Sequence, residues 1–316
     1  MKKINPENKI CIYLDQFVIS DIIDGTNPLW IKIKGLLELN YTEGKIYCPL
    51  SVEHTLETAK KKLKGAIKHD IYYKSISDNY LLKTEPFLTS QLISSLIRKN
   101  NLTLKTFLKS EKFRSFEKIY NEINKNNNIY NESITHKVSS QNSVRKILSH
   151  TKDIKDEQVL INAIKNIEID KFISRLKDYL KNENIIIRPD NYGKHNFPNW
   201  IDQLLYQLTN KHQFKKKEFK NLLNELERNG YSRIPTLHTR VSLIAYLAIK
   251  NKQENTGDHI DIMRISSYLF STDIFFTDKK RKHEICDLKL DKKYNTKVYS
   301  GVKQDLVEFI CYLENI

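Results

Sequence analysis

The sequence predicts an α/β protein whose parallel sheet is assembled from both ends of the chain, with a helical segment inserted between them. Near both termini, short apolar runs bounded by turn residues alternate with amphipathic segments. Such alternation is typical of strands and helices in a parallel sheet. Between residues 85 and 253, apolar residues recur at three- and four-residue intervals, which is the period of helices.

The N-terminal segment contains the first expected strands. Residues 10–14 are an apolar run that we interpret as a buried strand, and the segment FVISDIID after Asp15 has the pattern of a helix. The run KIYCPL predicts a second strand, and Ser51 is well placed to cap the helix that follows. We expect that helix to continue through the lysine-rich residues 60–64 toward Leu82.

The strand pattern returns at the C-terminal end. DIFFTD is an apolar run in which Asp273 is expected only to begin the strand, NTKVYSG is another strand candidate, and KQDLVEFICYLEN predicts a closing helix. We therefore expect a sheet domain formed by residues 1–84 and 254–316 and an all-helical insertion formed by residues 85–253. The alternative is two unrelated terminal pieces around a helical domain, which leaves two undersized sheets.

The amino-acid composition says less about the binding partner than the hydrophobic pattern says about the fold. The chain of 316 residues has a formal charge of +15, and such a charge attracts polyanions, although lysines on an ordinary solvated surface give the same number. The four cysteines have no zinc-site spacing, and we see neither a signal peptide nor an apolar run of membrane-spanning length. A cytoplasmic location without a membrane partner is the corresponding expectation.

Acidic residues follow each of the expected strands. Asp15 ends the first strand, Glu53 and Glu57 lie in the first turns after the second, and Asp278 ends the strand near the C-terminus. In an open parallel sheet, ligands bind beyond the carboxyl ends of the strands, so we expect these acids at one edge. Taken singly, each acid has an alternative role as a turn or helix cap.

A further pair of acids begins a helix upstream of the last strands. Asp258 and Asp261 are spaced i, i+3, which puts both on one helix face, and His259 between them is expected to be exposed. Gathered carboxylates repel, and a hard divalent cation relieves that repulsion. We therefore expect Mg²⁺ or Mn²⁺ as cofactor, with ligands Asp15, Glu57, Asp258, Asp261 and Asp278.

Basic residues follow two of the acidic segments directly. One run is Lys60 to Lys64 and the other is Lys279 to Lys282. Both runs are suited to binding a phosphodiester backbone, and the alternative is that they form an ordinary solvated surface. The substrate contacts that we expect are made by Gln16, His54, Lys61, Lys64, Lys279 and Lys280. His54 has an equal alternative as a half-buried structural residue, and Trp200 either stacks on an unpaired base or forms a local apolar contact.

Three segments together resemble the acidic blocks of PIN-like domain nucleases. They are IYLDQFVISD, PLSVEHTLET and DHIDIMRISSYLFSTDIFFTDKK, and the resemblance covers roughly the first 60 and last 65 residues. It implies a doubly wound α/β/α fold, one or two Mg²⁺ or Mn²⁺ ions, and cleavage of RNA. The family's acids correspond to Asp15, Asp21, Glu57, Asp258, Asp261 and Asp278. Phe17 departs from the family, which usually has Asn there, and Gln16 is the candidate replacement.

The function that follows as an expectation is a metal-dependent nuclease of RNA, with a role as a toxin or anti-phage effector by family analogy. Two alternatives stay open. One is an inactive PIN-like module that binds RNA or protein, and the other is a DNA nuclease of the same superfamily. The helical insertion is the expected route to a partner protein or to a homo-oligomer.

Overall fold

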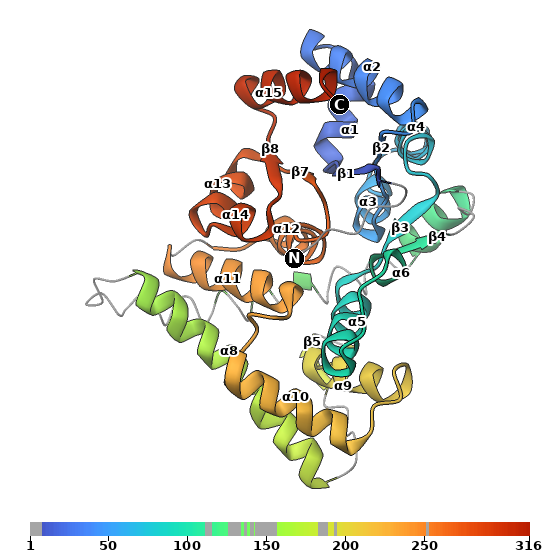
Figure 1. Ribbon diagram of the computed structural model, residues 1–316. Coiled ribbons are helices and arrows are strands. Elements are labelled where there is room, and N and C mark those ends of the chain that lie inside the picture. Colours follow the sequence, from blue (N-terminus) through green and yellow to red (C-terminus); the bar gives the residue numbers. More distant parts are fainter. Residues whose placement is uncertain are drawn as a thin grey trace. The chain divides into compact units, whose positions relative to one another are not determined.

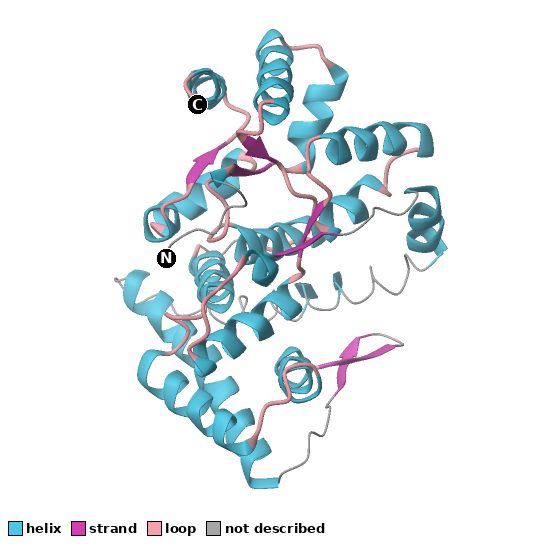
Figure 2. Ribbon diagram, turned by 45° about the vertical axis from the view of Figure 1, so that its right-hand side comes forward, coloured by secondary structure: helices cyan, strands magenta, loops and turns pink. Residues whose placement is uncertain are grey.

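The chain forms two compact units in a computed structural model that describes residues 8–110, 116–125, 134–135, 138–139, 142, 157–182, 189–192, 195–250 and 253–316. Unit 1 contains Met1–Thr84, Thr103–Asn126 and Tyr268–Ile316, and unit 2 contains Glu85–Leu102 and Asn127–Ser267 (Figures 1 and 2). Residues 103–126 thus belong with the sheet and residues 254–267 with the helices, where the sequence predicts the reverse.

Unit 1 is built on a four-stranded sheet with the order β2-β1-β7-β8. Its strands are β1 (Ile10–Tyr13), β2 (Ile46–Tyr47), β7 (Ile274–Phe276) and β8 (Lys297–Tyr299), and every neighbouring pair is parallel. The central pair joins the two ends of the chain. This confirms the predicted α/β class and the parallel sheet made from both ends.

Side chains of the two central strands alternate between two buried faces. On one face, the strands contribute Ile12, Leu14, Ile274 and Phe276 to the main hydrophobic cluster of unit 1. On the other face, the ring of Tyr13 stacks on that of Phe275, with centroids 4.6 Å apart. Burial on both faces explains why these strands read as continuous apolar runs rather than as alternating ones.

Helices from both ends of the chain cover the first face of the sheet. They are α1 (Gln16–Asp24), α2 (Pro28–Thr42) and α15 (Lys303–Glu314), and α2 and α15 pack side by side in Figure 1. Asn40 is 2% exposed and its amide Nδ2 donates to the carbonyl oxygens of Leu36 and Leu313, each at 2.9 Å. A buried polar bridge therefore ties the second helix to the last one.

The helix after Ser51 is shorter than the sequence predicts. α3 (Val52–Thr58) ends before the lysine run, α4 (Leu63–Ser75) follows, and Leu82 lies in β3 (Tyr80–Leu82). Asp78 and Asn79 then adopt left-handed conformations, with φ of 52° and 57°, which ends the helical region.

Two short strand pairs overturn the expectation of an all-helical middle segment. β4 (Leu108–Ser110), which follows α6 (Leu104–Phe107), pairs antiparallel with β3. β5 (Pro189–Tyr192) pairs antiparallel with β6 (His195–Pro198). Proline fixes φ and lacks an N–H, so it suits the outer ends of an extended pair better than the interior of a helix.

Unit 2 has a hydrophobic core of its own. Its helices are α5 (Glu85–Arg98), α8 (Glu157–Asn182), α9 (Trp200–Asn210), α10 (Lys216–Asn229), α11 (Pro235–Ile249) and α12 (Thr256–Tyr268). The last residue of α12, Tyr268, belongs to unit 1. Phe172 and Leu176 of α8 pack with Leu208, Phe219 and Leu222 at the centre of this core. Across the described ranges, none of the helices is both long and apolar enough to span a membrane.

Candidate functional site

Two carboxylates lie at the carboxyl ends of the central strands. Asp15 is the second residue after β1 and caps α1, with Oδ1 accepting the Gln16 N–H at 2.6 Å. Asp278 is the second residue after β7 and caps α13 (Lys279–Asp287), with Oδ1 accepting the Arg281 N–H at 2.9 Å. Because Tyr13 of β1 is in register with Phe275 of β7, and parallel neighbours lie about 5 Å apart, both acids occupy one edge of the sheet.

The two glutamates of α3 have different surroundings. Glu53 is 2% exposed, and its Oε2 accepts a hydrogen bond from the Tyr268 hydroxyl at 2.7 Å. Burial and the neighbouring Glu53 carboxylate raise the pKa of Tyr268 well above its ordinary value, so the phenol remains a donor. Glu57 lies one turn further along and is half-buried. Of the two candidates, Glu57 is therefore the more accessible metal ligand.

His54 stabilises the connection between β2 and α3. Its backbone N–H donates to Ser51 Oγ at 3.2 Å, and its Nδ1 accepts the Ser51 N–H at 3.1 Å, which completes a capping box. The ring lies between those of Tyr13 and Tyr73, with centroid distances of 4.9 and 4.5 Å. Its side chain is fully buried, which favours the structural role for His54 over contact with a phosphate.

Gln16 presents an unmatched donor next to Asp15. The side chain is 9% exposed, and its Oε1 accepts a hydrogen bond from the Thr58 hydroxyl at 3.3 Å. Within the described part of the chain, its buried Nε2 meets no acceptor. A buried amide donor without a partner is costly, so a ligand oxygen at this position would be stabilised. A contact of Gln16 with substrate stays a prediction.

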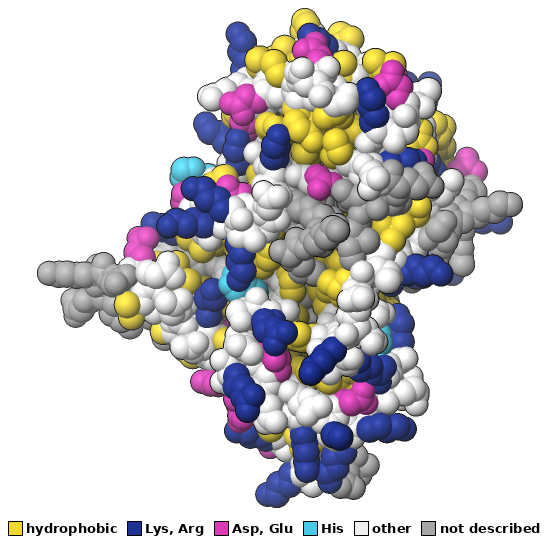
Figure 3. Space-filling model, viewed as in Figure 1, with side chains coloured by type: hydrophobic (Ala, Val, Ile, Leu, Met, Phe, Trp, Pro, Cys, Tyr) yellow, Lys and Arg dark blue, Asp and Glu magenta, His cyan; other side chains and the backbone are white. Residues whose placement is uncertain are grey.

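The predicted basic contacts differ in how they are held. Lys61 Nζ donates to Ser20 Oγ at 3.1 Å, whereas Lys64, Lys279 and Lys280 are exposed. Figure 3 shows lysine and arginine side chains scattered among acidic and uncharged ones, rather than gathered into one patch on that face. The net charge alone therefore does not mark a binding surface there.

The second half of the lysine and arginine run at 279–282 is structural. Arg281 is fully buried and forms an ion pair with Glu284, and Lys282 pairs with Asp305 at 2.6 Å. Asp305 is itself 4% exposed and accepts the Ser300 N–H at 2.7 Å, just after β8. The sequence pattern did not single out this acid, which lies in the first turn of α15, six residues after the end of β8.

Asp258 and Asp261 belong to unit 2, whereas the other candidate acids belong to unit 1. Asp258 Oδ2 accepts the Asn255 N–H at 2.9 Å, and the Asp258 N–H donates to Asn255 Oδ1 at 2.8 Å, so the pair caps α12. Asp261 forms an ion pair with Arg264. The role of both acids as metal ligands stays a prediction.

The expectation that His259 is exposed is wrong. Its side chain is buried in unit 2, and its Nδ1 lies 3.1 Å from Glu254 Oε1. A carboxylate five residues earlier thus provides the buried ring with a polar partner, and a buried imidazole needs one. Sequence spacing did not reveal that partner.

The residues of unit 1 form a donor set that suits a hard divalent cation. Asp15, Glu57 and Asp278 carry carboxylate oxygens, which Mg²⁺ and Mn²⁺ prefer, and the Gln16 amide can donate to an oxygen beside them. Among the residues that the structure describes, no group of three or more His, Cys, Asp or Glu side chains is already gathered at metal-binding distance. The fit is therefore one of ligand chemistry and of position at the sheet edge.

Comparison with known proteins gives no relative from which a function could be transferred. No protein-family model matches the chain. Neither a curated protein nor a solved structure matches it.

Proposed function

We propose that unit 1 is the catalytic part of a nuclease that hydrolyses phosphodiester bonds with Mg²⁺ or Mn²⁺. The observation that carries the proposal is the placement of Asp15 and Asp278 at the carboxyl ends of adjacent parallel strands. That edge is where open α/β sheets bind their ligands. Gln16, whose buried amide Nε2 has no partner among the described residues, directly follows Asp15 at the start of α1.

In this proposal the residues near the carboxyl edge of the sheet have different roles. Asp15, Glu57 and Asp278 hold the metal. The metal, when bound, supplies an activated water and neutralises charge on the phosphate. Gln16 donates to a phosphate or water oxygen, and the exposed Lys64, Lys279 and Lys280 hold the strand on either side.

RNA is the proposed substrate class, and a cytoplasmic toxin or anti-phage effector is the proposed role. Both rest on the resemblance to PIN-like nucleases in the segments around Asp15, Glu57 and Asp278. The carboxylate chemistry itself serves RNA and DNA equally well, because both present the same phosphodiester oxygens to the metal. The choice between them belongs to the experiment.

The test is cleavage of labelled RNA and of DNA with the same sequence, each in Mn²⁺, in Mg²⁺ and in a chelator. Asp15→Asn and Asp278→Asn should each lower cleavage roughly 100-fold or more, because an amide is a poor ligand for these ions. Both variants should stay folded, since Asn also caps helices well. Asp24→Asn, on the exposed last residue of α1, makes the same charge change and should cleave like the unmodified protein.

Each outcome of the assay decides between the candidate functions. Cleavage that is equal in the unmodified protein and in Asp15→Asn contradicts the proposed site. Cleavage of DNA with RNA left intact replaces the substrate class but keeps the site. Tight binding of RNA in chelator, with no product in either metal, contradicts the nuclease and supports an inactive binding module.

A further inference from the structure

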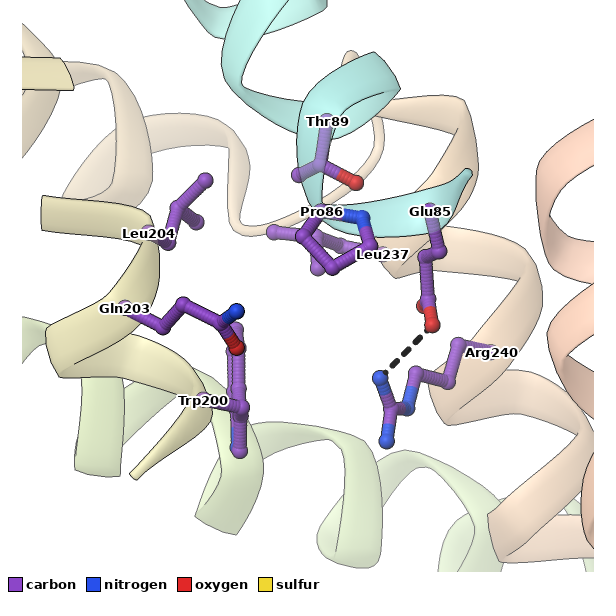
Figure 4. Close-up of a pocket in the computed structure, with 8 residues that line it drawn as sticks. All are labelled: Glu85, Pro86, Thr89, Trp200, Gln203, Leu204, Leu237 and Arg240. Carbon is purple, nitrogen blue, oxygen red and sulfur yellow. Dashed lines mark hydrogen bonds and ion pairs between the residues drawn. The ribbon is translucent and has the colours of Figure 1, made fainter. Parts of the chain in front are cut away.

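The pocket lined by Glu85, Trp200 and Arg240 in unit 2 is filled largely by its own side chains (Figure 4). Arg240 pairs with Glu85 at 2.9 Å, and its guanidinium lies over the Trp200 ring, 5.9 Å from the centroid. The remaining volume of about 30 Å³ has room for water but not for a base. These contacts favour the local role of Trp200 over stacking on a nucleic acid.

Helix α2 of unit 1, by contrast, carries an uncovered apolar stripe. Ile31 and Leu39 are each 53% exposed, whereas Ile33 and Leu37 of the same helix are fully buried in the core. Ile31, Gly35 and Leu39 follow one another at intervals of four residues, so they lie on one face of the helix. Single exposed apolar residues are ordinary, but an aligned stripe is typical of a helix that packs against a partner.

Gly35 lies at the centre of this stripe. Nothing lies within 4 Å of the position that an added Cβ would take, and the backbone of Gly35 is not in a left-handed conformation. Neither an internal contact nor the backbone therefore requires glycine here, although glycine stabilises the interior of a helix less than alanine does. The absence of a side chain does allow a second helix to approach the backbone of α2 closely.

The neighbouring helix α15 adds apolar surface beside the stripe. α15 packs side by side with α2 in Figure 1, and its Val307 is 44% exposed. Cys311, one turn after Val307, is exposed as well. Figure 3 shows hydrophobic side chains at the top of the molecule, where Figure 1 places α2 and α15. Two adjacent helices thus expose apolar side chains on this part of unit 1.

The charges of α2 run from basic to acidic along the helix. Lys32 is held by Glu314 of α15 at 2.6 Å. Lys34 and Glu38 lie on the other flank of the stripe, with Nζ and Oε1 4.0 Å apart. Both side chains are roughly half exposed, and such a pair is weak, so each charge remains able to attract a second helix. A helix with the same sequence and the opposite direction would place a glutamate beside Lys34 and a lysine beside Glu38.

We propose that this face of α2 binds the same face of a second copy of the chain, with the two helices antiparallel about a two-fold axis. Gly35 meets Gly35 of the second copy at the centre, and Ile31 packs against Leu39 of the second copy. Lys34 pairs with Glu38 of the second copy. A two-fold interface needs a patch that is complementary to itself, and reversal of α2 meets this condition for its apolar and its charged residues.

Charge selects a second copy over a different protein. A partner of one predominant charge would meet like charges along one half of α2. The interface belongs to unit 1, whereas the sequence predicts a homo-oligomer through the helical insertion. None of its residues belongs to the proposed metal site, so the dimer and the nuclease stand or fall separately.

The first measurement is sedimentation velocity of the full chain over roughly a hundredfold range of concentration around the micromolar level. One helix pair makes a small interface, so a concentration-dependent equilibrium of monomer and dimer is expected. Ile31→Glu should raise the dissociation constant at least roughly tenfold, because it buries a charge in the apolar stripe. Ile167→Glu makes the same change on α8 of unit 2, at a side chain that is also 53% exposed, and should leave the dimer intact.

Charge reversal tests the direction of the two helices. Lys34→Glu and Glu38→Lys should each weaken the dimer roughly tenfold at low salt, because each puts like charges face to face. The double variant should restore the dimer. An equimolar mixture of the two single variants should also form dimers, since each chain then supplies the charge that the other lacks.

Gly35→Ala separates the interface from the stability of the fold. The added methyl group favours the helix but holds the two backbones apart, so the variant should dimerise a few-fold more weakly while its monomer melts at a higher temperature. A variant that dimerised weakly because it folds poorly would melt at a lower temperature instead.

A chain that stays monomeric at every concentration overturns the proposal. A dimer that Ile31→Glu leaves intact, or that Ile167→Glu weakens equally, also overturns it, because the interface then lies elsewhere. Failure of the mixed charge variants to pair contradicts the antiparallel arrangement. None of these outcomes depends on metal or on cleavage, so they are distinct from failure of the nuclease assay.

Discussion

The hydroxyl of Tyr268 donates a hydrogen bond to Oε2 of Glu53 at 2.7 Å, between residues 215 positions apart in the sequence. Both side chains are buried in unit 1, and the bond joins α3 to the segment that leads into β7. It occupies one oxygen of Glu53 with a structural contact. Glu57, one turn later and half-buried, is the more accessible of the two glutamates.

The two glutamates should therefore respond differently to the same substitution. Glu57→Gln is expected to lower metal-dependent cleavage at least roughly tenfold and to leave the urea midpoint unchanged, because it removes a metal ligand. Glu53→Gln is expected to keep most of the activity and to lose about 1 kcal/mol of unfolding free energy, since a neutral amide accepts more weakly. The reverse assignment of the two effects would show that Glu53 is the ligand.

Tyr268 also makes the stability of the fold sensitive to high pH. Burial and Glu53 raise its pKa in the folded state above the ordinary value of 10.0, so the folded state holds this proton more tightly than the unfolded state does. The corresponding stability is fully present below pH 10 and declines as the pH rises further. Tyr268→Phe should be less stable at pH 8 by about 1–3 kcal/mol, because Glu53 loses its donor.

The difference between the unmodified protein and Tyr268→Phe should then narrow above pH 10, as measured by urea denaturation across that range. Tyr206→Phe, at a tyrosine that is 48% exposed, is the control and should track the unmodified protein. A gap that stays constant with pH would mean that the Tyr268 phenol does not contribute to the alkaline loss.

Gly230 is required by the backbone at the end of α10. Its φ is +52°, and an added Cβ would lie 2.8 Å from Cδ1 of Ile169. Gly230→Ala should lower the unfolding free energy by about 1–3 kcal/mol. Gly35 lies inside α2 with nothing within 4 Å of an added Cβ, so Gly35→Ala should raise stability by about 0.5–1 kcal/mol. Thermal melts of the two variants should shift in opposite directions, and a shift of both in the same direction contradicts this account.

The buried hydrogen bonds of Asn40 should contribute more to the free energy of unfolding than an exposed hydrogen bond on the same helix does. Asn40→Ala removes both bonds from the buried Nδ2 and should cost about 1–3 kcal/mol, because the Leu313 carbonyl is left without that donor. Thr42→Ala removes an exposed bond to the Glu38 carbonyl and should cost below about 0.5 kcal/mol. Equal midpoints for these two variants in urea would show that the bridge adds no stability.

Local pattern was sufficient to predict the strands and the caps. The apolar runs at Ile12 and Phe275 are continuous because both sheet faces are buried, and Ser51 caps its helix as its position indicates. The early end of α3 and the strand pairs at β3–β4 and β5–β6 were not predicted. The strand pairs depend on pairing between distant segments, which a hydrophobic period does not report.

The candidate site was predictable in its positions but not in its contacts. Asp15 and Asp278 follow from the rule that ligands lie beyond strand ends, whereas Asp305 lies within the helix after β8 and does not follow from it. The bond from Tyr268 to Glu53 and the burial of His259 against Glu254 could not be predicted from spacing. The pocket at Glu85 and Arg240 joins residues 155 positions apart, so only the packed helices reveal it.

The pairing of β1 with β7 sets an order of events during synthesis. The Cys11 N–H donates to Oδ2 of Asp273, 262 residues later, at the start of that pairing. A ribosome therefore adds the 262 residues that separate Cys11 from Asp273 before the centre of the sheet can close, and until then one edge of β1 has no strand beside it. Such long-range pairing is slow and leaves apolar strand edges open to aggregation. The residues of unit 2 are all synthesised before β7, so unit 2 can pack before the C-terminal part of unit 1 has been synthesised.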